Sequence, residues 1–428
     1  MKLIERALQR RHEEGRPIRV LLVGAGAMGR ALVYQVTKHV PGMEISAIAN
    51  RTTENAVTAY ANAGIEAPRI VTDLDQLEAA ISDGAPAVTA DAEMACGAKG
   101  IDAVWEVTGA VEFGCLIAMR AIAERKHLVT MNAEMQGTVG PILKKHADDA
   151  GVIVTDSEGD QPGVMMNLYH FVSSLGLRPV LLGNLKGLHD PYRTYSTQID
   201  FAKRKGLTPN MAASFADGTK MSFEMALVAN ATGLRAGRVG LYGFKASHVS
   251  EAAELFDVDE LLEVGLVDYL VGAEPAPGVF SLGTTDEPFQ QRWLELYKLG
   301  NGPLYLFYTP YHLCHLEAPR SIVRAVDFRD PTVTPDVGHV VDVVATAKKD
   351  LKAGEKIDGI GFYATYGQCA NSAQVLEEGL LPMGLAEGAR LVRDVAKDML
   401  LRFSDVELPE GRLVDRLWEE QRRVCPPF

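Results

Sequence analysis

Three glycines, at positions 24, 26 and 29, directly follow the apolar run Val20–Val23 and open a stretch of helical character. In a strand–helix unit this spacing suits a pyrophosphate. The first glycine permits a sharp turn, the second lets the backbone approach phosphate, and the third lets the helix pack against the strand. The pattern predicts a dinucleotide site whose contacts are Gly24, Gly26, Ala27, Met28 and Gly29.

The next apolar run, Glu44–Ala49, ends at Asn50, Arg51 and Thr52. A site selective for NADH usually carries an acid here, which binds the ribose 2′-hydroxyl. Arg51 would instead pair with a 2′-phosphate, and its small polar neighbours would add hydrogen bonds. NADPH is therefore favoured over NADH; the alternative is that Arg51 is a solvated loop cation.

Later apolar runs, Ile101–Val107 and His127–Met131, predict further parallel strands that alternate with helices. Open α/β sheets bind ligands at the carboxyl ends of their strands. The polar residues that follow these two strands are therefore expected to face the nicotinamide. They are Thr108, Gly109, Asn132 and Glu134.

The composition limits the possible partners of this 428-residue chain, whose net charge is −13. Nucleic acids and anionic membranes require a basic surface, so neither is an expected partner. No apolar run is long enough to span a bilayer, and five scattered cysteines predict neither disulfides nor a zinc ribbon. We expect a cytoplasmic protein that binds a small molecule and forms a homo-oligomer.

The alternation of predicted strands and helices along the sequence predicts an α/β protein with three domains. Residues 1–160 predict a Rossmann domain, a doubly wound parallel sheet that binds NAD(P). Residues 161–339 predict an inserted α+β substrate domain. Residues 340–428 predict a β-rich domain with a C-terminal tail.

The order of the glycine turn, Glu106-Val107-Thr108-Gly109 and Lys126–Asn132 resembles the nucleotide-binding half of homoserine dehydrogenases. Residues 347–355, Ala-Lys-Lys-Asp-Leu-Lys-Ala-Gly-Glu, resemble the SAF domain, a small β-clip-like module. Together with Gly159–Pro162 and Ser214–Lys220, they make the chain similar to SAF-containing, homoserine-dehydrogenase-like oxidoreductases. Some members of that group are reductoisomerase-like enzymes that act on 1-deoxy-D-xylulose 5-phosphate.

The resemblance implies candidate catalytic residues on one predicted helix. Homoserine dehydrogenases present an aspartate and, one turn later, a lysine; counting back from Gly233, this chain has Lys220 and Glu224 at those places. Residues four apart share a helix face, so both could reach one substrate. The alternative is an ordinary ion pair on a solvated face. Lys186, at the end of a predicted strand, is a second cationic candidate, although such a lysine is often merely solvated.

Acidic and histidine residues offer possible metal ligands. Glu158 and Asp160 could hold Mg²⁺ or Mn²⁺, which a reductoisomerase would use to bind a hydroxy-ketone, whereas Asp160 could equally cap a helix. His312, His315 and Glu317 have a spacing compatible with zinc, but core or interface histidines explain them as well.

Basic side chains near residue 200 offer a third possible ligand site. Arg193, Lys203, Arg204 and Lys205 would suit a phosphorylated substrate or lie on a solvated loop.

Three functions follow from these patterns. The first is an NADPH-dependent reductase or reductoisomerase in which Lys220 or Lys186 protonates the substrate oxygen, with Glu224, Asp160 or Glu158 as the base. The second is a dehydrogenase of another sugar acid or of a nucleotide-linked sugar. The third is a non-catalytic NADPH sensor or assembly module.

Overall fold

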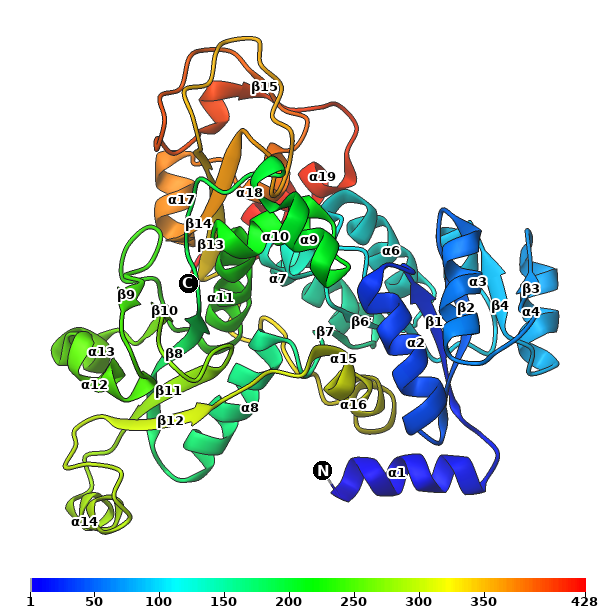
Figure 1. The fold of residues 1–428 in the computed structure, drawn as a ribbon, viewed down its shortest axis with the longest axis horizontal. Helices are drawn as coiled ribbons and strands as arrows, with labels where there is room; N and C mark the ends of the chain where they lie inside the picture. The colour runs from blue at the N-terminus through cyan, green and yellow to red at the C-terminus, as the bar shows by residue number, and fades with distance from the viewer. Residues whose placement is uncertain (1) are drawn as a thin grey trace. The chain divides into compact units, whose positions relative to one another are not determined.

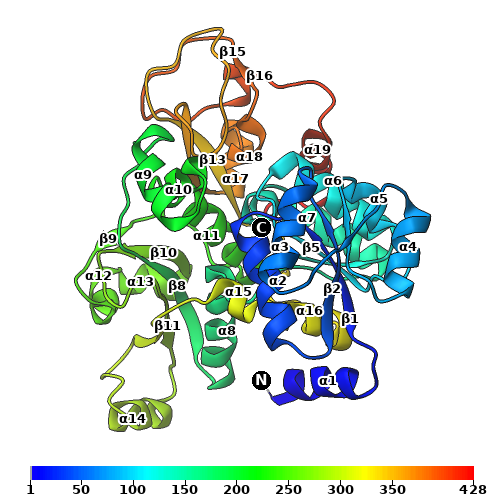
Figure 2. The ribbon, with the colours of Figure 1, turned by 45° about the vertical axis from the view of Figure 1, so that its right-hand side comes forward.

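The computed structural model describes residues 2–428, and their internal contacts divide the chain into two compact units (Figures 1 and 2). Unit 1 contains the chain up to Asp160 together with Leu313–Thr334. Unit 2 contains Gln161–His312 together with Pro335–Phe428. The predicted division into three domains stays a prediction.

Unit 1 is built on a seven-stranded sheet in which every strand pair is parallel. The order of the strands reverses between β1 and β5, which places a topological switch point beside the end of β1. In order across the sheet the strands are β3 (Arg69–Ile70), β4 (Ala87–Thr89), β2 (Met43–Ala49), β1 (Ile18–Val23), β5 (Ala103–Glu106), β6 (His127–Thr130) and β7 (Val154–Asp156).

The central strand β1 is apolar except for Arg19, and its other residues are buried. Such a run is typical of a parallel strand that is covered on both faces. The helices of this unit are α1 (Lys2–Glu13), α2 (Ala27–His39), α3 (Thr53–Asn62), α4 (Leu74–Ser82), α5 (Ala92–Cys96), α6 (Val111–Ala123) and α7 (Ala133–Ala150). The predicted α/β class with a Rossmann sheet is confirmed.

The segment Leu313–Thr334 returns to unit 1 after the chain has passed through unit 2. It forms α15 (Cys314–Glu317), α16 (Pro319–Val323) and the π-helical turn η3 (Arg324–Phe328). Ile322 and Val323 are fully buried in the same core as Leu22 and Trp105. The end of the sequence stretch predicted as a substrate domain therefore helps to build the core of unit 1.

Unit 2 contains a mixed five-stranded sheet with β8 at its centre. Strand β8 pairs in parallel with β10 and antiparallel with β11. In order across the sheet the strands are β12 (Tyr305–Thr309), β11 (Val279–Thr284), β8 (Arg178–Lys186), β10 (Leu266–Val271) and β9 (Phe244–Lys245).

Helix α11 of unit 2 is buried along almost its whole length. It packs against β13 and β14 and also contacts α8 and β10. The helices that precede the C-terminal region are α8 (Gln161–Ser174), α9 (Ile199–Lys205), α10 (Pro209–Ala216), α11 (Thr219–Thr232), α12 (Ala252–Leu255), α13 (Val258–Glu263) and α14 (Pro288–Leu296), with the short 3₁₀ turns η1 (Ser196–Gln198) and η2 (Val249–Glu251).

The C-terminal region of unit 2 is built around the antiparallel pair of β13 and β14. Lys348, which follows β13, is buried and forms an ion pair of 2.7 Å with buried Asp217. That pair joins the region to the loop before α11. Its elements are β13 (Val341–Ala347), β14 (Thr365–Asn371), α17 (Ser372–Glu378), α18 (Met383–Ala386), β15 (Arg390–Leu391), η4 (Phe403–Asp405), β16 (Val406–Glu407) and α19 (Leu413–Val424). Its assignment as a SAF domain stays a prediction.

No helix within residues 2–428 combines the length and the apolar composition needed to cross a membrane.

Candidate functional site

The predicted glycine turn lies between β1 and α2 in unit 1. Gly24 has a φ of +109°, which favours glycine, and a Cβ atom at Gly29 would lie 2.1 Å from the carbonyl oxygen of Gly24. The space beside Gly26, at the N-cap of α2, is open. The turn thus passes close to the helix and leaves exposed backbone at the helix N-terminus, which is the arrangement that binds phosphate.

Asn50 ties this turn to the end of β2. Its Oδ1 accepts the backbone N–H of Ala25 at 2.9 Å, and its Nδ2 donates to the carbonyl oxygen of Thr52 at 2.7 Å. Arg51, between them in sequence, is exposed. Asn50 therefore positions the loop that carries Arg51, and the predicted contacts of these residues with a nucleotide remain proposals.

A buried carboxylate, that of Glu106 at the end of β5, joins the loops that were predicted to face nicotinamide. It accepts the backbone N–H of Thr108 at 2.7 Å, Nδ2 of Asn132 at 2.9 Å and the hydroxyl of Thr130 at 3.2 Å. The Thr108 hydroxyl also donates to it. Burial raises the pKa of Glu106, although these hydrogen bonds oppose the shift.

Asn132 is also the N-cap of α7 and accepts the backbone N–H of Met135 at 3.1 Å. Gly109 adopts a φ of +69°, and Glu134 is buried in the first turn of α7. Both ends of the Asn132 side-chain amide therefore form hydrogen bonds within the protein, with Glu106 and with the backbone of Met135. Glu106 was not among the residues predicted from the sequence, although an acid at the end of an apolar strand was a visible signal.

Four polar side chains of unit 2 form a hydrogen-bonded cluster at the end of β8. Nζ of Lys186 donates to Oε1 of Gln161 at 2.7 Å and pairs with Oε2 of Glu224 at 3.3 Å. Nδ2 of Asn184 donates to that same oxygen of Glu224 at 3.1 Å. The Lys186 side chain is 17% exposed and that of Glu224 only 4%. Two donors on one carboxylate oxygen help to offset the desolvation of the buried charge.

Three different elements supply this cluster: α8, β8 and α11. Lys220 is half-buried one turn before Glu224 on α11, so both predicted residues lie on one helix. The structure adds Asn184 and Gln161, which the sequence analysis missed. A polar residue inside an apolar strand was the signal for Asn184. An ammonium group held by a buried carboxylate is suited to protonate or polarise a carbonyl oxygen.

Glu158 and Asp160 lie in the turn that follows β7. Oε1 of Glu158 accepts from Arg324 at 3.1 Å, and the same guanidinium binds Asp330 at 2.8 Å. The thiol of Cys314 lies 3.9 Å from Oδ1 of Asp160. No group of three or more His, Cys, Asp or Glu residues suited to a metal occurs within residues 2–428. With Arg324 on its carboxylate, Glu158 does not fit the predicted Mg²⁺ or Mn²⁺ site.

The histidines considered for zinc have other surroundings. Nδ1 of His312 lies 3.2 Å from the carbonyl oxygen of Pro277, while Glu317 pairs with Arg320 at 3.3 Å. Burial lowers the pKa of His315. These contacts give the trio no metal-binding arrangement.

The predicted cations near residue 200 differ in their surroundings. Arg193 pairs with Asp190 at 3.0 Å. Lys203, Arg204 and Lys205 are exposed on α9.

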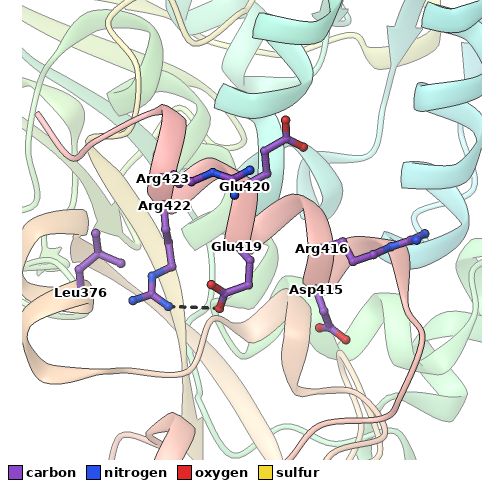
Figure 3. A pocket seen from close by; sticks show the side chains of 7 residues that line it. All are labelled: Leu376, Asp415, Arg416, Glu419, Glu420, Arg422 and Arg423. Atoms are coloured by element: carbon purple, nitrogen blue, oxygen red, sulfur yellow. Dashed lines mark hydrogen bonds and ion pairs between the residues drawn. The ribbon is translucent and has the colours of Figure 1, made fainter.

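An open groove of about 710 Å³ lies beside α19 (Figure 3). Its charged side chains pair locally: Arg422 with Glu419 at 3.1 Å, and Asp415 with Arg412 at 2.7 Å. None of the predicted site residues lines it. The groove is lined by Leu376, Asp415, Arg416, Glu419, Glu420, Arg422 and Arg423.

Residues 159–318 match the family model described as "Oxidoreductase DRL, catalytic domain". The matched segment includes Gln161, Asn184, Lys186 and Glu224. It confirms the prediction that the chain is an enzyme of the oxidoreductase class. No curated protein sequence matches the chain.

Several solved structures are similar to the chain at low sequence identity. A probable dehydrogenase from Thermotoga maritima is 12% identical, with 73% of this chain and 90% of that chain covered and a TM-score of 0.40. The 1-deoxy-D-xylulose 5-phosphate reductoisomerase from Zymomonas mobilis, in complex with NADPH, is 11% identical, with coverage of 74% and 71% and a TM-score of 0.39. A scyllo-inositol dehydrogenase from Lactobacillus casei is 13% identical, with coverage of 63% and 66% and a TM-score of 0.32.

Glu106 should make the stability of the protein depend on pH. Because its pKa is raised in the folded state, the unfolded chain ionises first, and Glu106 loses stabilising effect as the pH rises from about 4.3 through its folded pKa. Glu106→Gln cannot ionise. The difference in unfolding free energy between wild type and Glu106→Gln, measured by urea unfolding at a series of pH values, should therefore shift against the wild type as the pH rises above about 4.3. A difference that is independent of pH, or that shifts in favour of the wild type, would contradict this prediction.

Proposed function

We propose that this oxidoreductase transfers a hydride between NADP(H) and a carbon of a small hydroxylated substrate, with Lys186 as the proton donor to the substrate oxygen. The ion pair between the partly buried Lys186 and the buried Glu224 carries this proposal. It lies in the segment that matches the oxidoreductase catalytic domain.

The residues of unit 1 fit a dinucleotide. Gly24 and Gly29 form the close turn, and open space beside Gly26 leaves the N-terminus of α2 accessible to phosphate. Arg51, exposed at the end of β2, would pair with a 2′-phosphate and so favour NADPH. When bound, the nicotinamide group supplies or accepts the hydride.

In the reducing direction the carbonyl carbon gains a hydride and its oxygen gains a proton. Lys186 would give that proton from Nζ and regain one from water. Glu224 keeps the ammonium charged and fixes its position, while Asn184 and Gln161 hold the two groups in register. In the oxidising direction Lys186 would first give a proton to water, and its neutral amine would then accept the proton of the substrate hydroxyl.

We propose 1-deoxy-D-xylulose 5-phosphate as the first substrate to test. The motifs that resemble the reductoisomerase-like group support this choice, and the exposed cations Lys203, Arg204 and Lys205 would suit a phosphate group. If the reaction is a reductoisomerisation, its rearrangement also requires a base, for which Glu224 is available.

The direct test is NADPH oxidation by purified protein with this substrate, with and without Mg²⁺ or Mn²⁺, and with product mass determined. Oxidation that yields methylerythritol phosphate would support both the reaction and the substrate. If NADPH binds but stays unoxidised with this substrate, the choice of substrate is wrong. A panel of sugar acids and nucleotide sugars then tests the hydride transfer itself, and no turnover on any of them would contradict it.

Replacement of Lys186 by methionine should lower kcat by about 10²–10⁴-fold, because the substrate oxygen loses its proton donor. Lys349→Ala is the matched control, since Lys349 is an exposed lysine of the same unit that pairs with Glu355. Steady-state kinetics should show normal kcat in the control. An unfolding midpoint and NADPH affinity measured on each variant would show that the fold is retained. Normal kcat in Lys186→Met would contradict the assigned role.

Replacement of Arg51 by alanine should weaken the binding of NADPH but not of NADH. Hydrogen bonds to a charged group contribute about 1.5–3 kcal/mol, which corresponds to a rise of about 10- to 100-fold in Kd. Fluorescence titration with both cofactors measures the effect, and NADH serves as the internal control. An equal loss for both cofactors, or no loss for either, would show that Arg51 does not bind the 2′-phosphate.

A further inference from the structure

Glu106, at the end of β5, is a buried carboxylate whose two oxygens each accept two hydrogen bonds. Oε1 accepts the backbone N–H and the hydroxyl of Thr108, and Oε2 accepts the hydroxyl of Thr130 and Nδ2 of Asn132. The Thr108 hydroxyl itself accepts the backbone N–H of Ala110 at 3.3 Å. The Thr130 hydroxyl accepts that of Asn132 at 2.9 Å. Each hydroxyl proton is therefore left to point at the carboxylate, and this set of donors suits the ionised form of Glu106.

The donors come from the two loops that follow β5 and β6. Thr108 and Ala110 belong to the loop between β5 and α6, whereas Asn132 follows β6. Asn132 also joins the loops directly, because its Nδ2 donates to the carbonyl oxygen of Ala110 at 3.0 Å. Gly114, in the first turn of α6, leaves room for this contact, since a Cβ atom there would lie 2.6 Å from Nδ2 of Asn132. Glu106 is thus the shared anchor of the two loops.

The loop between β5 and α6 also borders the glycine turn. Strand β5 is the neighbour of β1 on the other side of the sheet from β2. A Cβ atom at Gly24 would lie 3.2 Å from Cγ2 of Thr108, so Thr108 packs against the turn that is expected to bind pyrophosphate. Gly109, at the tip of the loop, is exposed, and the space beside it is open. The anchored loop therefore offers exposed backbone next to the glycine turn.

The topology of the sheet indicates which half of a dinucleotide these loops would meet. In a doubly wound sheet a dinucleotide lies across the switch point, with one mononucleotide on each half of the sheet. Arg51 follows β2 and would meet the adenosine half with its 2′-phosphate. The loops after β5 and β6 lie on the opposite side of β1 and would meet the nicotinamide half. Glu106 is fully buried, so it would act on the ligand through these loops and not by touching it.

We propose that Glu106 is a positioning residue for the nicotinamide half of the cofactor, whose carboxylate holds residues 107–110 and 131–132 in the shape that receives the ring. This inference rests on the proposed binding of NADP(H) by unit 1. A buried carboxylate destabilises a fold unless hydrogen bonds offset its desolvation. An apolar side chain would avoid that cost, but it would leave the N–H of Thr108 and the amide of Asn132 without an acceptor, and the loops would lose their common anchor.

Replacement of Glu106 by glutamine breaks this anchor with little change of size. The carbonyl oxygen of glutamine accepts hydrogen bonds, but its Nε2 only donates. Whichever way the new amide turns, Nε2 meets a group that also only donates, either the N–H of Thr108 or Nδ2 of Asn132. One of the two loops therefore loses its link to the end of β5.

Two ligands separate the halves of the site: NADPH, and 2′-phospho-ADP-ribose, which lacks the nicotinamide ring. Calorimetric titration of the full chain should show that Glu106→Gln raises the Kd of NADPH by about tenfold, because a buried donor is left unpaired. The Kd of 2′-phospho-ADP-ribose should stay within about twofold of the wild-type value. A general loosening of the fold would instead weaken the binding of both ligands alike.

Glu44→Gln is the matched control. Glu44 lies near the amino end of β2, away from the loops, and pairs with Arg19 at 3.2 Å. This variant should leave both Kd values unchanged. The unfolding midpoint of each variant shows whether its fold is retained.

Thr130→Val is a second variant that weakens the anchor from its buried side. Thr130 is fully buried and cannot touch a ligand, and valine keeps its shape but removes the hydroxyl between Glu106 and Asn132. The Kd of NADPH should rise by about threefold to tenfold, again without a change for 2′-phospho-ADP-ribose.

The outcomes distinguish this inference from the proposed function. Equal weakening of both ligands in the folded variants, or an unchanged Kd of NADPH in both variants, would overturn the role of Glu106 and leave cofactor binding intact. A wild type that binds 2′-phospho-ADP-ribose as tightly as NADPH would also overturn that role, because the ring would then gain nothing from the loops. A wild type that binds neither ligand would contradict the proposed function and this inference with it.

Discussion

The pairing of the partly buried Lys186 with the buried carboxylate of Glu224 at the end of β8 is the constraint on which unit 2 depends. Moving either charge out of water costs several kcal/mol, so the pair persists only if hydrogen bonds satisfy it. Asn184 and Gln161 supply those bonds, and each of α8, β8 and α11 contributes at least one member of the cluster. These three elements must therefore keep a fixed arrangement, and the buried helix α11 and the ion pair of Lys348 with Asp217 support it.

Unit 1 also contains a buried carboxylate, but uncharged hydrogen-bond donors satisfy it in place of a cation. Its buried acid, Glu106, has no cationic partner among its hydrogen-bond donors and is satisfied by backbone, hydroxyl and amide groups from the ends of neighbouring strands. The glycine turn leaves helix N–H groups accessible at the switch point of the sheet. A helix N-terminus that is accessible to phosphate suits a nicotinamide dinucleotide, and the partly buried ammonium group of Lys186 suits proton transfer.

The features of the fold and the site that could be predicted from the sequence are local in the chain. The turn from Gly24 to Gly29 is a contiguous pattern, and Lys220 and Glu224 are one helical turn apart. The partner of Glu224 was not predictable in this way, because Lys186 reaches it through the packing of β8 against α11. Asn184 stood out as a polar residue in an apolar strand, but its contact with Glu224 was not predictable because the two residues are distant in the sequence. Glu158 was predicted as a metal ligand from its neighbours in the sequence. Its ion pair with Arg324 was not predictable, because Arg324 belongs to the distant segment Leu313–Thr334.

The central claim is that Lys186 and Glu224 act as one unit on the substrate's proton, and a double-mutant cycle on kcat/KM tests it most directly. The variants are Lys186→Met, Glu224→Gln and their combination, each verified by its unfolding midpoint. If the pair acts as a unit, the double variant should lose about as much activity as the more damaging single variant. Losses that multiply would show that the two residues act independently and would contradict the account.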